Sequence, residues 1–270
     1  MPIAPDDENG AVDFKVKWKC SILFPANSIN RLLGQTNVSY LRLELSDLSQ
    51  VRSFVQQWNE KRYPSIQYLL LNAGLQFPGP VEYTADGYET TFATNHTGHA
   101  LFGTHDPAQK TGLPDARYNT AEGLAHPTRE SARFPGRQRY ATSKLANVLW
   151  VYALHRRLVK LKDFKSWTVC ASCPGLMPGT GLVRAGNAVE RFLWHHVLPR
   201  IIPLLRLVLR SSNIQLPQVS GTALAYLATT EASSGVYYEG RKQIKSSDVG
   251  CDAAKQEDLW EWTWRREDNN

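Results

Sequence analysis

Apolar residues follow two different spacings along this chain, and the two alternate. Short runs rich in apolar residues are typical of strands, and continuous ones are typical of strands covered on both faces. Such runs occur at residues 40–45, 66–71, 167–173 and 236–238. Apolar residues at helical spacing occur over residues 48–59, 87–102, 140–160 and 221–228. Strands that alternate with helices predict an α/β fold in which helices cover both faces of a parallel sheet.

The two ends of the chain carry patterns of their own. Residues 15–20 alternate lysine with bulkier side chains, which is typical of a half-exposed strand whose lysines protect a sheet edge. At the other end, Trp260, Trp262 and Trp264 predict the end of a helix that docks on the rest of the chain. We interpret these tryptophans as packing residues.

Length and composition fit one domain. A chain of 270 residues with 42% hydrophobic residues can bury one sizeable core. Its net charge of +6 comes from 31 basic and 25 acidic residues spread along the sequence. This spread argues against nucleic-acid binding, which needs a concentrated basic stripe. The net positive charge suits an anionic cofactor equally well.

The cysteines and the N-terminus bear on location. Four cysteines do not make a disulfide framework in a chain of this size, so a reducing compartment is expected. Asp6, Asp7 and Glu8 stand near the start, without the basic and then apolar regions of a secretory signal. We therefore expect a cytoplasmic protein.

Residues 192–210 are strongly apolar but interrupted. They contain His195, His196, Arg200, Arg206 and two prolines, whereas a membrane-spanning helix needs ~18 uninterrupted apolar residues. We expect a surface-lying or substrate-covering helix pair. Because basic residues on an apolar helix suit an anionic interface, peripheral membrane or partner contact through residues 192–210 is a second interpretation.

Two residue pairs have the spacing of metal ligands, but neither predicts a metal site. Cys170 and Cys173 lie in an apolar strand, where positions three apart point to opposite faces. His96 and His99 have helical spacing, yet no carboxylate or further histidine that could complete a site is evident nearby.

Tyr140 and Lys144 are the candidate catalytic pair. Their spacing places them on one face of a helix. A free tyrosine has a pKa of about 10, so it moves protons at neutral pH only where its phenolate is stabilised, and a neighbouring ammonium does this. Tyr140 is then expected to donate a proton to a substrate carbonyl oxygen, or to act in reverse during alcohol oxidation.

Other short motifs accompany this pair. Asn72-Ala73-Gly74 follows the apolar run 66–71, Asn95 stands between, and Pro174-Gly175 follows the run 167–173. Ligands bind at the carboxyl ends of strands in a parallel α/β sheet, where Asp47, Asn72-Ala73-Gly74 and Pro174-Gly175 are expected. Local sequence leaves alternatives open, because Asp47 also suits a helix N-cap and residues 72–74 an ordinary turn.

In this order, a YxxxK motif after NAG and before PG resembles the short-chain dehydrogenase/reductase family. The resemblance covers roughly residues 38–264 and is strongest to the retinol-dehydrogenase-like and protochlorophyllide-reductase-like branch. It implies a Rossmann-like doubly wound parallel sheet and a nicotinamide cofactor, NADP with NAD as the alternative. It also implies hydride transfer between that cofactor and a hydrophobic carbonyl or alcohol.

The resemblance further implies roles for single residues. Asp47 would face the adenine side of the cofactor, and Asn72, Ala73 and Gly74 its ribose and centre. Tyr140 and Lys144 would also contact the cofactor, with Lys144 holding the nicotinamide ribose, and Asn95 would link Lys144 through water to bulk solvent. The nicotinamide end would be formed by Pro174, Gly175, Met177 and Thr180.

Two parts that the family needs are missing. Between residues 1 and 70 the only glycines are Gly10 and Gly34, and neither follows a strand as a phosphate-binding loop requires. Between Asn95 and Tyr140 the only serine is Ser131, in a polar run without a preceding strand, so Thr104 is the nearer candidate for a substitute hydroxyl. We therefore expect an incomplete sheet, without the first and serine-bearing strands, in which residues 15–24 could replace one of them.

The sequence thus predicts an atypical N-terminal segment, residues 1–30, followed by a single short-chain dehydrogenase-like domain, residues 31–270. Two functions stay open. The first is an NAD(P)-dependent oxidoreductase for a small hydrophobic substrate. The second is a catalytically impaired relic, or a shortened reading frame, that binds no dinucleotide.

Overall fold

The computed structural model describes residues 23–61, 63, 66–77, 79–100, 115–161, 167–183, 186–230 and 232–268. The predicted strand at residues 15–20 and the substitute hydroxyl at Thr104 lie outside these residues. Contacts divide the chain into two units, Met1–Arg42 and Leu43–Asn270. The predicted boundary after residue 30 stays a prediction.

The first unit contains α1 (Leu23–Leu33). Beyond its end, Gly34 adopts a positive φ of 63°, a conformation that glycine tolerates without strain. The Asn30 side chain donates to the carbonyl oxygen of Val38 at 2.8 Å and accepts from its N–H at 3.0 Å. One amide side chain thus fixes the segment that follows the helix.

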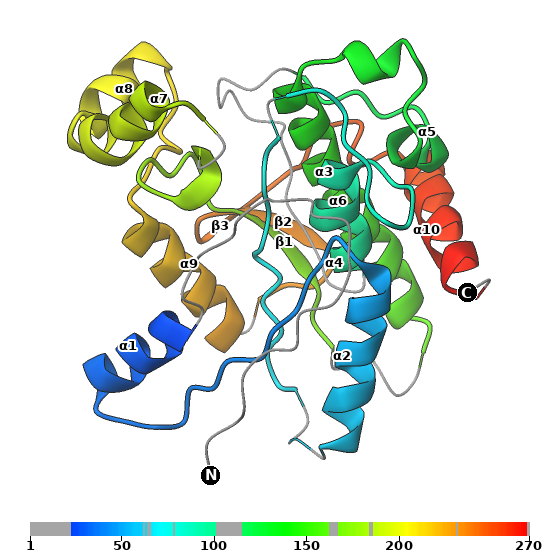
Figure 1. Cartoon of the computed structure of the whole chain (residues 1–270), viewed down its shortest axis with the longest axis horizontal. Helices are drawn as coiled ribbons and strands as arrows, with labels where there is room; N and C mark the ends of the chain where they lie inside the picture. The colour runs from blue at the N-terminus through cyan, green and yellow to red at the C-terminus, as the bar shows by residue number, and fades with distance from the viewer. Residues whose placement is uncertain are drawn as a thin grey trace, which may run out of the picture. The chain divides into compact units, whose positions relative to one another are not determined.

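The second unit holds the sheet and the remaining helices (Figure 1). Its elements before the sheet are α2 (Leu48–Glu60), α3 (Thr90–Phe92), the π-helix η1 (Ala93–Thr97), α4 (Gly98–Ala100), α5 (Ala121–Ala125), the 3₁₀-helix η2 (Ser131–Arg133), and α6 (Gly136–Leu158). From the sheet onward they are β1 (Cys170–Cys173), η4 (Gly181–Val183), α7 (Ala188–Phe192), η5 (Leu193–Val197), η6 (Leu198–Arg200), α8 (Ile202–Val208), α9 (Pro217–Thr229), β2 (Val236–Glu239), β3 (Lys242–Ile244) and α10 (Ala253–Asp268).

Within the described residues the sheet has the order β1-β2-β3. β1 pairs with β2 in parallel, with Cys170 opposite Val236, and β2 pairs with β3 antiparallel. The strands predicted at residues 167–173 and 236–238 are therefore confirmed. The sequence predicts an α/β fold with an incomplete parallel sheet, and this class is confirmed, although β3 adds an antiparallel pair.

Helix α6 lies between the sheet and α10 and makes both halves of the core. Val148 and Val151 of α6 pack with Ala171 of β1 and Tyr237 of β2, all essentially without exposure. From its other side, the Trp150 ring stacks on Trp260 of α10 with ring centroids 4.4 Å apart. The C-terminal helix docks as expected, and Figure 1 shows it beside α6.

The strands predicted at residues 40–45 and 66–71 are wrong. Both segments lie outside every ladder of the described chain, and Tyr68, Leu69 and Leu70 keep about half or more of their surface exposed. An apolar run becomes a strand only where a neighbouring strand takes up its N–H and C=O groups. The described residues provide no such neighbour for either run.

The helix predictions need one correction. α2, α6 and α9 confirm the predicted helices at residues 48–59, 140–160 and 221–228. The expected helix at 87–102 instead starts at Thr90, because the Glu89 carboxylate caps the Phe92 N–H, and it contains the π-helical turn η1. π-helical turns inside α-helices are frequent at functional sites.

Candidate active site

Helix α6 places Tyr140 and Lys144 on one face, as their spacing predicts. The Lys144 Nζ lies 5.7 Å from the centroid of the Tyr140 ring. Lys144 is buried, with 8% of its surface exposed, and Tyr140 is partly buried. The pair therefore consists of a buried cation and a partly buried tyrosine.

The Lys144 ammonium faces the turn at Gly74. A β-carbon added to Gly74 would lie 2.6 Å from Lys144 Nζ and 3.4 Å from Asn95 Oδ1. A side chain at residue 74 would thus displace the lysine. Burial lowers the pKa of Lys144 to about 8, and within the described residues no hydrogen bond or ion pair engages its Nζ.

Asn95 and His99 form hydrogen bonds with the backbone of residues 73–75, which a neighbouring strand would form in a sheet. Asn95 accepts from the Leu75 N–H at 2.8 Å and donates to the Leu75 carbonyl at 2.7 Å. His99 Nε2 lies 2.6 Å from the carbonyl oxygen of Ala73. Two side chains of the η1–α4 segment therefore take over the hydrogen bonding of an extended segment.

A second layer of polar side chains supports Asn95. Its Nδ2 also donates to Ser143 Oγ at 3.1 Å, and Asn147 Nδ2 donates to the Asn95 carbonyl at 2.8 Å. His96 Nδ1 lies 2.9 Å from Asn147 Oδ1. Asn95 is thus bonded on all sides by protein groups, and its predicted water link to solvent stays a prediction.

Sequence reasoning considered His96 and His99 only as a metal pair and missed their hydrogen bonds. Burial lowers the pKa of each to about 4, and the nearby Lys144 adds to the effect on His99. Both imidazoles are therefore neutral at neutral pH. Within the described residues no group of three or more histidines, cysteines or acids could hold a metal ion.

The pKa of the Tyr140 phenol differs from what the sequence led us to expect. Burial, with a smaller contribution from Cys173, raises the pKa of Tyr140 to about 12. Lys144 Nζ lies 5.7 Å from the ring centroid, and burial outweighs the stabilisation that this ammonium offers the phenolate. In this arrangement Tyr140 is a protonated acid at neutral pH.

Pro174 and Gly175 follow directly after the end of β1. Gly175 has a φ of 78°, and a β-carbon there would lie 2.2 Å from Asn213 Oδ1. Asn213 also donates to Cys173 Sγ at 3.2 Å, and its carbonyl accepts from the Leu176 N–H at 2.9 Å. Sequence reasoning missed Asn213, for which no local motif gives a signal.

Met177 and Thr180 lie farther along the same loop. The Thr180 hydroxyl donates to the Met177 carbonyl at 2.9 Å, which closes a tight turn. The Thr180 carbonyl accepts from Trp194 Nε1 of η5 at 2.8 Å. The loop that leaves the sheet is thereby attached to the helical segment that follows it.

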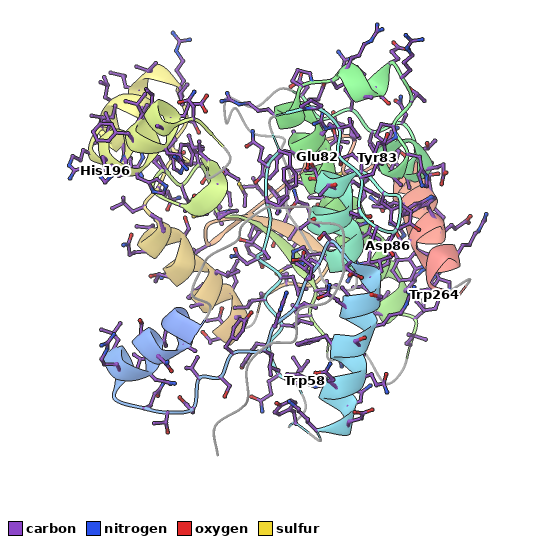
Figure 2. The ribbon with its side chains drawn as sticks, in the orientation of Figure 1. Trp58, Glu82, Tyr83, Asp86, His196 and Trp264 are labelled. Atoms are coloured by element: carbon purple, nitrogen blue, oxygen red, sulfur yellow. The ribbon has the colours of Figure 1, made fainter. Side chains whose placement is uncertain are left out.

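Asp47 serves as the N-cap of α2. Its carboxylate accepts from the N–H groups of Ser49 and Gln50 and from both of their side chains. These hydrogen bonds lower the pKa of Asp47. Asp86 caps the same end by accepting from the Leu48 N–H at 3.1 Å, and Figure 2 shows it beside the start of α2.

The structure brings together Gly74, Asn95, Tyr140 and Lys144. The Asn72 side chain is exposed. Ser131 Oγ stays in a local turn, 3.1 Å from Thr128 Oγ1. The hydrogen bonds given for Asp47 and Ser131 join each residue to partners two or three positions away in the sequence.

Known proteins are similar in sequence to this chain over most of its length. The chain is 27% identical over 271 aligned residues to a protochlorophyllide reductase of Daucus carota, an alignment that covers 85% of this chain and 65% of the carrot protein. It is 29% identical over 255 residues to a polyprenol dehydrogenase of Danio rerio, covering 88% of this chain and 73% of that protein. The chain is related to the short-chain dehydrogenases and reductases.

A solved structure has a similar fold. An uncharacterized protein from Mycobacterium paratuberculosis matches with a TM-score of 0.57 at 22% identity, over 88% of this chain and 78% of that one. No family model matches the chain. The chain spans 51 to 73% of the length of the curated relatives that it matches.

Proposed function

We propose that this chain is an oxidoreductase that transfers hydride between a nicotinamide cofactor, NADP with NAD as the alternative, and a hydrophobic carbonyl or alcohol. The observation that carries the proposal is the Lys144 ammonium. It is buried at Gly74, one helical turn from Tyr140, and within the described residues no counter-charge neutralises it. A buried cation costs stability unless a ligand uses it.

The residues fit the nicotinamide end of such a cofactor. Lys144 offers ammonium N–H groups to ribose hydroxyls, and the absence of a side chain at Gly74 leaves room beside it. The described residues do not offer a glycine-rich loop for the diphosphate, and the Asp47 carboxylate already caps α2. The fit is therefore to one half of the dinucleotide.

Tyr140 is the proton donor in the proposed reaction. When bound, the nicotinamide supplies hydride to the carbonyl carbon. The Tyr140 hydroxyl gives its proton to the carbonyl oxygen, so that an alcohol forms and a phenolate remains. Lys144 stabilises this phenolate, and Asn95 keeps the turn at Gly74 in position against Lys144.

The names of the relatives support the reaction class. They include a protochlorophyllide reductase and a polyprenol dehydrogenase, which are named for a reduction and for an oxidation.

A catalytically impaired relic is the second candidate. Two observations favour it: Asp47 is engaged as a helix cap, and residues 66–71 lie outside every ladder of the described chain. In this case the Tyr140–Lys144 pair would remain as family scaffold without a cofactor.

Titration of the whole chain with NADPH and NADH, followed by fluorescence, separates the two candidates. The proposal expects saturable micromolar binding that Lys144→Met weakens at least tenfold, while Lys160→Met, at an exposed lysine on the turn after α6, leaves it unchanged. Circular dichroism confirms folding of each variant. A folded wild-type chain without binding would establish the relic, and equal binding by both lysine variants would remove Lys144 from the site.

A further inference from the structure

Residues 187–210 form a helical arm, built from α7, η5, η6 and α8, that is apolar on an outer face as well as an inner one. The inner face is fixed to the loop after β1 and to Ile214. Trp194 Nε1 donates to the Thr180 carbonyl at 2.8 Å, and Arg206 Nε donates to the Ile214 carbonyl at 2.9 Å. Trp194 and Ile202 are buried, with 9% and 8% of their surfaces exposed.

The arm carries two exposed apolar stripes with the same spacing. Residues at positions i, i+3 and i+4 of a helix lie side by side on its surface. The stripes are Val189, Phe192 and Leu193, and Leu204, Leu207 and Val208. Their exposed fractions run from 43% at Leu193 to 75% at Leu207, although an inward face already anchors the arm.

Positive charge accompanies the stripes. The exposed basic side chains of the arm are Arg191, His195, His196, Arg200, Arg206 and Arg210, and the exposed acid is Glu190. Glu190 itself is engaged in a capping box with Asn187. Figure 2 shows the side chains of the arm spread over its outer side, with His196 among them. Apart from Arg206, which bonds Ile214, the exposed surface of the arm therefore combines apolar side chains with the arginines at residues 191, 200 and 210.

We infer that the arm docks on an anionic phospholipid bilayer. Apolar side chains of an interfacial helix insert at the level of the headgroups, while arginines extend along the surface to reach the phosphates. An uncharged apolar partner would leave the arginines without counter-charges. In the described residues no helix is both long and apolar enough to cross a membrane.

Flotation of the whole chain with vesicles tests the inference, and it needs no turnover or cofactor. The wild type should float with phosphatidylcholine vesicles that contain phosphatidylserine and stay behind with phosphatidylcholine alone. Leu204→Glu with Leu207→Glu should weaken binding at least tenfold. Arg191→Gln with Arg200→Gln should weaken it by about fivefold for each charge.

Matched variants on other elements control for general surface effects. Val219→Glu changes an apolar residue of α9 that is 52% exposed, and Arg129→Gln with Arg133→Gln removes two exposed charges elsewhere. These controls should bind as the wild type does, and circular dichroism should show all variants folded.

Three results would overturn the inference. The first is absence of wild-type flotation with anionic vesicles. The second is equal loss of binding in arm and control variants, which would mark a non-specific charge effect. The third is self-association that the arm variants abolish without any vesicle binding, which would show that a second copy covers the stripes.

Discussion

Lys144 is a cation that the folded chain buries without a carboxylate beside it in the described structure. Moving an ammonium out of water disfavours its charged form, which is why the pKa falls to about 8. The folded state therefore binds this proton less tightly than the unfolded chain does. The site proposed for the cofactor is, in its empty form, a source of instability.

The destabilising effect of the buried Lys144 ammonium should be visible in how the stability of the chain depends on pH. Between pH 8 and pH 10.5 the unfolded chain holds the Lys144 proton more tightly, so the free energy of unfolding rises with pH across that window. Below pH 8 the penalty is complete, and Lys144→Met should raise the free energy of unfolding by up to about 3 kcal/mol at pH 7. Urea unfolding at pH 7, 9 and 10.5 measures the difference, which should shrink to near zero at the highest pH.

Lys160→Met serves as the control, because Lys160 is exposed and its loss should leave stability within about 0.5 kcal/mol of wild type at every pH. A Lys144→Met variant that is less stable than the wild type at pH 7 would contradict the buried, unpaired state of the ammonium.

Tyr140 is predicted to act as an acid. Because its pKa is raised to about 12, the phenol is protonated at neutral pH and suited to reduction, whereas alcohol oxidation needs the phenolate and should accelerate as pH rises. Tyr140→Phe should lower kcat by 10²–10⁴-fold, the usual contribution of a general acid, with little change in cofactor affinity. Steady-state rates with a panel of hydrophobic aldehydes and alcohols measure both effects.

Turnover of Tyr140→Phe at the wild-type rate would show that another group supplies the proton. Loss of cofactor binding in the same variant would instead indicate that the phenol has a binding role.

At the scale of elements, the tight contact between α4 and the segment before α2 is the clearest packing constraint. A β-carbon on Gly98 would lie 2.2 Å from the Leu45 carbonyl oxygen and 2.9 Å from the Leu45 β-carbon. Since backbone atoms stand in the way, one of the two segments must shift. The contact holds residue 45, which the sequence placed in a strand, against the helix that carries Asn95.

Gly98→Ala should therefore destabilise the chain by about 1–3 kcal/mol. Gly221→Ala is the matched control, because Gly221 lies in α9 with nothing within 4 Å of an added β-carbon. That substitution should stabilise by about 0.5–1 kcal/mol through the lower helix propensity of glycine. Thermal unfolding of both variants tests the pair, and equal shifts would refute the proposed contact.

The sequence predicted the elements whose evidence is local. Helices α2, α6 and α9 follow from apolar spacing, and the i, i+4 relation of Tyr140 and Lys144 follows from helix geometry. Residues 66–71 failed because a strand depends on a neighbour elsewhere in the chain. His99 and Asn213 were missed for the same reason, since their partners, Ala73 and Cys173, are distant in sequence.

At the scale of the whole molecule, the small sheet leaves the regions around it with unequal local stability. The backbone groups of β1 and β2 are paired in a ladder and covered by α6, whereas residues 66–71 have neither protection. Regions with few buried contacts and exposed backbone open at low free energy.

Hydrogen exchange followed by mass spectrometry should resolve this difference. Backbone amides of residues 170–173 and 236–239 should be protected from exchange with deuterium. Those of residues 66–71 should exchange at close to the rates of an unfolded chain. Comparable protection of residues 66–71 would show that they pair with another strand after all. Repeating the measurement with NADPH shows whether the cofactor orders residues 72–75.

The unneutralised ammonium at residue 144 also bears on how the chain would change under selection. A population of variants selected only for heat resistance gains from any substitution that removes this cation. Selection for cofactor-dependent turnover would keep the lysine in spite of the gain. Sequencing codon 144 after laboratory evolution under each regime would therefore show whether the residue is retained for chemistry or merely inherited.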